Sequence, residues 1–199
     1  MTHIVLATED ALSEAVAEKL LTVSGKPFLI TQRLGNSGFG YLKKSLPKFN
    51  QIATNIMPVL LLTDLDRTDC ILDFIQEWKQ GEDLSERLLF RVVVREIEAW
   101  LLADRLALAE WLGINPATLP KEPESLVDPK RELLNLTKRS KYRKLKDMVL
   151  PAHKSHNTVG LGYNTELVRY VREKWNPLVA AESAPSLART LKRIQELAE

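Results

Sequence analysis

Three acidic side chains lie where short apolar segments of the chain end. Glu9 follows the run Ile4 to Ala7, and Asp64 and Asp66 follow the run Pro58 to Thr63. Side chains two residues apart on an extended backbone point to the same side, so Asp64 and Asp66 can reach one site. Clustered carboxylates repel each other, and a hard divalent cation such as Mg²⁺ relieves that repulsion. We therefore expect a metal site if the two apolar segments are neighbouring strands.

Each acid also has a structural alternative. Asp64 and Asp66 can simply begin a loop, with Asp66 capping the next helix. Asp10 is adjacent to Glu9 and can replace it as a ligand, or it can cap the helix that follows. For Asp10 and Glu14 we favour helix capping and a position near the positive end of the helix dipole.

The segment R-E-I-E-A-W-L-L-A-D, from Arg95 to Asp104, places glutamates where a strand gives way to a helix. Glu98 is a candidate further metal ligand or general base. Arg95 can pair with an acid or with a substrate phosphate. The alternative is an amphipathic helix with Trp100 in the core and solvated glutamates.

A basic segment provides the main candidate contact with nucleic acid. Six basic residues and no acidic residue occur between positions 138 and 146, namely Lys138, Arg139, Lys141, Arg143, Lys144 and Lys146. We expect a helix whose basic face contacts backbone phosphates, with ordinary solvated surface as the alternative. The glycine-rich stretch Gly35 to Gly40 matches no nucleotide-binding motif, so we interpret it as a turn and propose no nucleotide cofactor.

These residues need an α/β framework to hold them. Apolar periodicity predicts strands alternating with helices up to Leu112, which favours a mainly parallel sheet with helices on both faces. Beyond it no strand is expected. We predict an α/β domain over 1–113, a proline-rich linker over 114–129 and a helical appendage over 130–199 that packs on the domain. The predicted strands are Ile4–Ala7, Pro27–Thr31, Pro58–Thr63 and Leu88–Val94, and the predicted helices include Glu96–Leu112, Lys130–Leu150, Thr165–Trp175 and Ser186–Leu197.

Composition indicates an ordinary globular protein. The chain has 199 residues and a formal net charge of +2, and 45% of its residues are hydrophobic. The single cysteine, Cys70, excludes an internal disulfide framework. No apolar run approaches the roughly 18 residues that span a bilayer, and no signal peptide is recognisable, so we expect a cytoplasmic protein with no membrane partner.

A strand that ends in glutamate, followed by a later strand that ends in D-x-D, resembles the Toprim domain of topoisomerases, primases and OLD-type nucleases. The segments T-E-D-A-L-S-E, G-F-G-Y-L-K-K, L-T-D-L-D-R and R-E-I-E-A-W-L-L-A-D, with the late S-L-A-R, resemble a Toprim-like bacterial family known only as a domain of unknown function. The resemblance implies a Toprim-like fold with Glu9, Asp64 and Asp66 as ligands of Mg²⁺ or Mn²⁺. The usual Toprim glutamate precedes glycine, whereas Glu9 precedes Asp10, which leaves the choice between these two acids open.

Three functions fit these observations. The first is a metal-dependent nuclease that cleaves nucleic acid, as the effector of a bacterial defence system. The second is a haloacid-dehalogenase-like phosphatase, because L-L-L-T-D-L-D-R-T contains D-x-D-x-T after an apolar strand and Asp64 can be its nucleophile. The third is a non-catalytic partner of a separately encoded ATPase.

Overall fold

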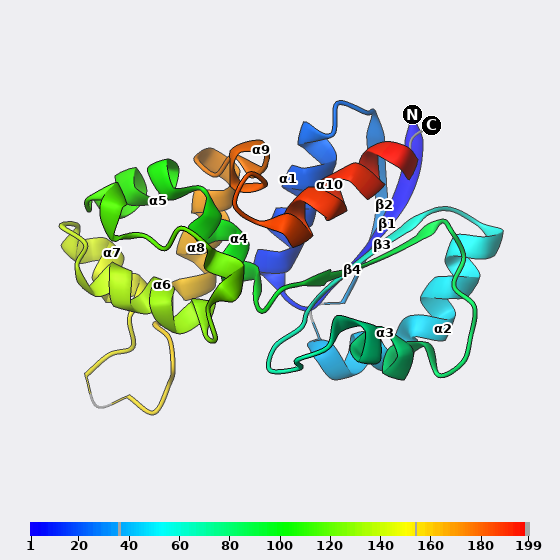
Figure 1. The fold of residues 1–199 in the computed structure, drawn as a ribbon, viewed down its shortest axis with the longest axis horizontal. Helices are drawn as coiled ribbons and strands as arrows, with labels where there is room; N and C mark the ends of the chain where they lie inside the picture. Colours follow the sequence, from blue (N-terminus) through cyan, green and yellow to red (C-terminus); the bar gives the residue numbers. More distant parts are fainter. Residues whose placement is uncertain (36, 154, 198–199) are drawn as a thin grey trace. The chain divides into compact units, whose positions relative to one another are not determined.

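The computed structural model describes residues 1–35, 37–153 and 155–197. Four parallel strands form one sheet in the order β2-β1-β3-β4 (Figure 1). The strands are β1 (Thr2–Thr8), β2 (Phe28–Gly35), β3 (Val59–Asp64) and β4 (Leu88–Val93). The predicted α/β class with a mainly parallel sheet is therefore confirmed.

Helices connect these strands and form most of the chain after β4. They are α1 (Ala11–Val23), α2 (Phe39–Asn55), α3 (Ile71–Lys79), α4 (Ile97–Ala103), α5 (Arg105–Leu112), α6 (Pro129–Lys138), α7 (Arg143–Val149), α8 (Tyr163–Glu173), α9 (Pro177–Ala180) and α10 (Pro185–Leu197). Two short 3₁₀ helices, η1 (Pro116–Thr118) and η2 (Pro123–Ser125), precede α6. In the part of the chain that the structure describes, no helix has the length and apolar character needed to span a membrane.

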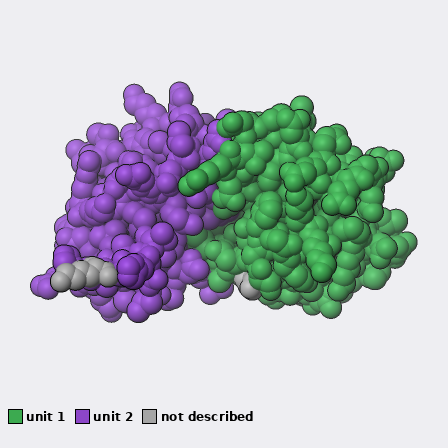
Figure 2. All heavy atoms as spheres, turned by 90° about the horizontal axis from the view of Figure 1, so that it is seen from below, with its two compact units in different colours: residues 1–94, 189–199 green, residues 95–188 purple. Residues whose placement is uncertain are grey.

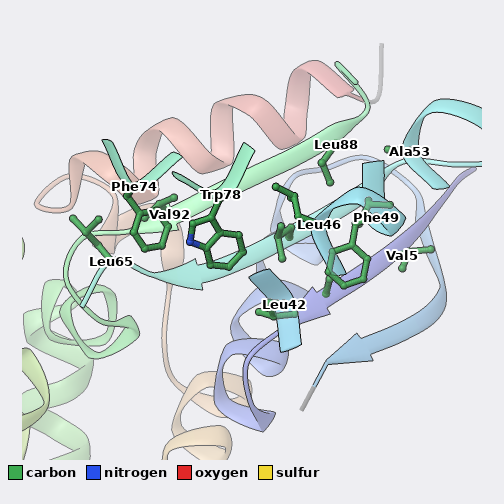
Figure 3. Close-up of a cluster of buried hydrophobic side chains, with 13 residues drawn as sticks. Val5, Leu42, Leu46, Phe49, Ala53, Leu65, Phe74, Trp78, Leu88 and Val92 are labelled. Carbon is green, nitrogen blue, oxygen red and sulfur yellow. The ribbon is translucent and has the colours of Figure 1, made fainter. Parts of the chain in front are cut away.

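The sheet is covered on both faces. Alternate residues of the central strands, such as Val5 of β1 and Leu61 of β3, join a core cluster with Phe49 of α2 and Trp78 of α3 (Figure 3). The other face meets α1 and the end of α10 (Figure 1). Because helices cover both faces of the sheet, the residues of the central strand β3 are buried on both sides, and this explains its almost continuous apolar sequence.

Two compact units make up the molecule, and they differ from the domains predicted by the sequence. Unit 1 contains Met1–Val94 and Arg189–Glu199, and unit 2 contains Arg95–Ala188 (Figure 2). Within unit 1, Arg91 Nε of β4 donates to Thr190 Oγ1 at 3.3 Å, which ties the middle of α10 to the sheet. A predicted boundary at 113 therefore lies inside unit 2, and the last residues of the predicted appendage return to the sheet.

Buried tryptophans explain why α4 and α5 belong to unit 2. Trp100 Nε1 donates to Ser186 Oγ at 2.8 Å, and Trp175 Nε1 donates to the Trp100 carbonyl at 3.1 Å. The predicted single helix Glu96–Leu112 is in fact two helices. Asp104 separates them, because its carboxylate accepts from Ala107 N at 3.3 Å and so caps α5.

The predicted linker 114–129 is fastened inside unit 2. It contains the two 3₁₀ helices, and the Glu124 carboxylate accepts hydrogen bonds from Ser186 N at 3.0 Å and from Ser186 Oγ at 2.5 Å. Proline at the first position of each 3₁₀ helix sets the backbone angle there without losing a needed donor. The prolines of residues 114–129 therefore form turns within unit 2 and do not indicate a mobile linker.

The expected basic helix is interrupted. α6 ends at Lys138, residues 139–142 are not helical, and α7 begins at Arg143. The buried Ser140 hydroxyl accepts from Tyr142 N at 3.0 Å, which offers the backbone a turn in place of a continuing helix. The prediction of one helix across 138–146 was wrong for this reason.

Candidate functional site

The Glu9 carboxylate lies at the end of β3. β1 and β3 are adjacent and parallel, so Glu9 leaves the sheet at the same edge as Asp64. Thr63 Oγ1 donates to Glu9 Oε1 at 2.5 Å, and the Asp64 backbone N–H donates to the same oxygen at 3.0 Å. Carboxyl ends of parallel strands form the usual ligand crevice of such sheets, so this edge is the candidate functional site.

The glycine-rich stretch supports the backbone beside Glu9. A Cβ on Gly35, whose φ is +124°, would lie 1.9 Å from the Thr8 carbonyl oxygen, so no larger residue fits. Gly38 N donates to the Glu9 carbonyl at 3.2 Å. The predicted turn thus holds β1 and the start of α2 together, and Asn36 of this stretch lies outside the described residues.

Asp66 does not cap a helix. Its φ of 51° is in the left-handed region, which an aspartate occupies at some energetic cost. α3 begins only at Ile71, and the Cys70 Sγ accepts from Asp73 N at 3.5 Å as its cap. The capping alternative for Asp66 was therefore wrong, and the left-handed backbone marks the D-x-D turn as a constrained position.

Asp10 has a structural role, as favoured from the sequence. Its Oδ1 accepts from Ser13 N at 2.8 Å and caps α1. Glu14, in the first turn of α1, forms an ion pair with Arg33 at 3.2 Å. The carboxylate that reaches the end of β3 is that of Glu9.

Burial is the largest influence on the charge state of Glu9. It raises the pKa of the carboxyl, while the hydrogen bonds from Thr63 and Asp64 lower it and the charges of Asp66 and Asp10 raise it further. Asp66 is thus close enough to Glu9 to repel its charge. Ionised Glu9 carries an energetic cost that a bound cation would offset.

The residues of this edge suit a cation that keeps much of its own water. Among the residues that the structure describes, no three or more His, Cys, Asp or Glu side chains are grouped so that they could enclose a metal ion. Mg²⁺ is commonly bound through only one or two carboxylates plus water and substrate phosphates. Oxygen donors from Glu9 and Asp64 at one strand edge fit that pattern, while the three-ligand site stays a prediction.

Glu98 belongs to unit 2 and is only 1% exposed, so the alternative of a solvated glutamate was wrong. Tyr163 Oη donates to Glu98 Oε1 at 2.6 Å, and Lys130 Nζ lies 3.5 Å from the same oxygen. Glu98 Oε2 is buried and has no hydrogen-bond partner among the described residues. Nothing local in the sequence indicated Tyr163 or Lys130 as partners, because they are far along the chain.

Glu96 is a second half-buried acid beside Glu98. Its Oε2 accepts from the Lys130 backbone N–H at 3.0 Å. Burial raises the pKa of Glu96, the hydrogen bond from Lys130 lowers it, and the charge of Glu98 raises it further. Two acids and Lys130 therefore meet within unit 2.

The basic segment remains available to solvent despite the broken helix. Lys138, Arg139, Lys141, Arg143 and Lys144 are exposed, and Lys146 is partly buried. Arg143 pairs only loosely with Asp147, at 3.9 Å on an exposed surface. The segment therefore keeps exposed positive charges that can contact phosphates. These charges lie on the end of α6, the turn after it and the start of α7 rather than on one helix.

Residues 7–154 match the family model described as "Domain of unknown function (DUF4276)". The chain belongs to this family. The family match includes Glu9, Asp64, Asp66, Glu98 and the basic segment. A comparison with curated proteins finds no match.

Among solved structures, the chain is similar to the C-terminal region of the Burkholderia pseudomallei OLD protein. The two cover 100% of each other at 14% sequence identity, with a TM-score of 0.50. At this identity the likeness concerns the fold. For this member of the DUF4276 family, the fold is therefore similar to that of the C-terminal region of an OLD protein, as the strand-end acids led us to expect.

Proposed function

We propose that this protein is a Mg²⁺-dependent enzyme that cleaves phosphodiester bonds in nucleic acid. The observation that carries the proposal is the Glu9 carboxylate, which is held at the end of β3 by Thr63 and by the Asp64 backbone. Asp66 lies near enough to raise the pKa of Glu9. The similarity of the fold to the C-terminal region of an OLD protein agrees with the resemblance to OLD-type nucleases noted in the sequence.

Each residue of the site would have its own task. Glu9, Asp64 and Asp66 would hold the cation, with Mn²⁺ as a possible substitute. When bound, such an ion polarises a phosphate oxygen and makes water more acidic. Thr63 keeps one Glu9 oxygen fixed by hydrogen bonding, and the other oxygen would then serve the cation.

Glu98 is a further candidate catalytic group. Its Oε1 is held by Tyr163 and Lys130, and its Oε2 has no hydrogen-bond partner in the described part of the chain. A buried acceptor without a partner is costly, and function is a common reason for keeping one. The basic segment would position the nucleic-acid backbone without reading its sequence.

The phosphatase alternative has weaker support. That family needs a later strand that ends in acidic residues, whereas β4 ends in Val92 and Val93. The next acid, Glu96, directly precedes α4 in unit 2, where it accepts from the Lys130 backbone N–H. A separately encoded ATPase remains our proposal for a partner, because the solved structure that the chain resembles is the C-terminal region of an OLD protein. Nuclease activity that appears only when such an ATPase is added would identify that requirement.

The test replaces one carboxylate at a time. Asp64→Asn and Asp66→Asn should each reduce Mg²⁺-dependent cleavage of DNA or RNA by about 100-fold or more, because an amide keeps the shape of the side chain but lacks the charge that holds the cation. Asp10→Asn is the matched control: asparagine also caps helices, so its activity should remain near that of the unchanged protein. Cleavage is followed on gels with Mg²⁺ and with a chelator.

Two results would count against the proposal. Turnover of a small phosphate monoester through a phospho-enzyme at Asp64, with nucleic acid untouched, would establish the phosphatase. Full nuclease activity in Asp64→Asn would remove Asp64 from the site. Loss of activity in Asp10→Asn as well would return Asp10 to the set of candidate ligands.

A further inference from the structure

A cavity of about 250 Å³ opens within unit 2 next to the basic segment. Trp111 of α5, Tyr142 before α7 and Leu145 of α7 supply its apolar walls, while Lys144, Glu166 and Arg169 supply charge. Pockets for whole drug-sized ligands usually measure roughly 300–1,000 Å³. This cavity is therefore suited to one planar group rather than to a whole cofactor.

Its aromatic walls are held in place. The Trp111 ring packs against the buried Tyr170 ring with centroids 5.1 Å apart. Tyr142 is fixed at its backbone by the buried Ser140 hydroxyl, yet it remains 45% exposed. A large aromatic residue fixed at its backbone and still half exposed can offer a face to a ligand.

Positive charge surrounds the same opening. Lys141 Nζ lies 5.2 Å from the centre of the Tyr142 ring. The Lys141 stem crosses the end of α5, because a Cβ on Gly113 would lie 2.5 Å from its Cε. Lys144 is exposed at the mouth of the cavity. A ligand that places a planar group inside would thus hold an attached anion against these cations.

One polar group inside the cavity adds directionality. Glu166 is only 8% exposed and forms an ion pair with Arg169. A carboxylate accepts hydrogen bonds from the exocyclic amino groups of nucleobases, as it does from cytosine N4. Aromatic walls, a carboxylate and flanking cations together match a nucleotide better than a purely apolar ligand.

We propose that this cavity binds the base of an unpaired nucleotide, with Tyr142 as the stacking residue and the basic segment on the neighbouring phosphates. The inference rests on the proposed function and specifies its substrate as nucleic acid with at least one unstacked base. Stacking of bases on aromatic side chains, combined with a basic path for the backbone, is how proteins commonly bind single strands.

Binding is measured on the full chain carrying Asp64→Asn, so that cleavage does not interfere. Trp78, Trp100 and Trp175 are buried whereas Trp111 is partly exposed, so quenching of tryptophan fluorescence by a single-stranded oligonucleotide reports mainly on the cavity. Trp111→Phe should remove most of that quenching.

Tyr142→Ala should weaken binding of single-stranded DNA or RNA by roughly 5- to 150-fold, which is the usual range for losing one stacked base. Tyr142→Phe, which keeps a ring, should bind like the unchanged protein. Tyr41→Ala, at another exposed tyrosine, is the matched control and should have no effect. An oligomer of abasic sites, which keeps the phosphates, should bind equally to the Tyr142→Ala variant and its parent.

Equal affinity of the Tyr142→Ala variant and its parent for a single strand would overturn the inference, and so would quenching that persists in Trp111→Phe. If no single strand binds but duplex is still cleaved in an Asp64-dependent way, the cavity proposal fails and the proposed nuclease stands. If Tyr142-dependent binding is seen while Asp64→Asn leaves cleavage unchanged, the proposed site fails and the cavity stands.

Discussion

Glu9 has a carboxylate that is largely removed from water although one of its oxygens accepts two hydrogen bonds. Burial has the larger effect, so the pKa of Glu9 lies above its ordinary value of 4.5. The folded protein therefore holds this proton more tightly than the unfolded chain does. Protonation of Glu9 therefore stabilises the folded state. This contribution to the free energy of unfolding is complete below pH 4.5 and is lost as the pH rises through the higher pKa of the folded protein.

Glu9→Gln should stabilise the metal-free protein at neutral pH. Glutamine keeps an oxygen that can accept from Thr63 and Asp64 but has no charge to desolvate, so we expect a gain of roughly 0.5–2 kcal/mol in the free energy of unfolding. The loss of stability above pH 4.5 should also become smaller. Chemical denaturation across pH measures both effects.

Mg²⁺ provides the second half of this test. Saturating Mg²⁺ should raise the melting temperature of the unchanged protein more than that of Glu9→Gln, because a ligand of the folded state stabilises by mass action. Glu86→Gln, at an exposed position, should respond to Mg²⁺ like the unchanged protein. A variant Glu9→Gln that is less stable than its parent at neutral pH would refute this account of Glu9.

At the scale of elements, adjacency of β1 and β3 brings the candidate ligands to one edge. The order β2-β1-β3-β4 places both strands in the centre of the sheet. The chain between β2 and α2 has to pass close to Thr8 and Glu9. Gly35 contacts Thr8, and Gly38 N donates to the Glu9 carbonyl. The glycine-rich stretch thus contributes to the site through its backbone.

Gly35→Ala should therefore destabilise the protein strongly. A Cβ there would lie 1.9 Å from the Thr8 carbonyl oxygen, and the φ of +124° is strained for any other residue. We expect a loss of about 2–4 kcal/mol. Gly40→Ala is the control, because a Cβ there meets nothing within 4 Å and alanine is the better helix former. Equal stability of the two variants in urea would contradict this description of Gly35.

On the scale of the whole molecule, the chain forms one sheet-based unit and one helical unit. Unit 1 contains the strand-end acids, and unit 2 contains Glu98, the basic segment and the cavity of about 250 Å³. The candidate metal ligands and the candidate nucleic-acid contacts thus come from different parts of the chain. The nuclease that we propose would therefore draw on residues of both units.

Replacing Lys141, Arg143 and Lys144 by alanine should weaken nucleic-acid binding and flatten its dependence on salt. Each lost phosphate contact lowers the slope of log K against log salt by about 0.9 on duplex DNA and by about 0.7 on single strands. The matched control replaces Lys48, Lys79 and Lys192, which changes the net charge equally in unit 1. An unchanged slope in the first triple variant would assign the segment to ordinary surface.

Local patterns in the sequence were sufficient for the elements and the class of fold. The apolar run before Asp64 predicts a buried strand, and the glycine after Leu112 marks the end of α5, where it adopts a φ of +64°. Such signals can be read from the sequence because a strand's burial and a helix's end are each determined by a few neighbouring residues. The strand-end positions of Glu9 and Asp64 were likewise readable from the sequence.

Tertiary structure alone decided which partner each acid meets. Glu9 and Asp10 are neighbours with similar chemistry, and only the packing of β1 against β3 directs Glu9 to Thr63 while Asp10 caps α1. For Glu98 the sequence left a metal ligand or general base and a solvated glutamate as alternatives, and the hydrogen bond from Tyr163, 65 residues further along the chain, could not be foreseen. Local periodicity contains no information on such distant partners, because their contact depends on how whole helices pack.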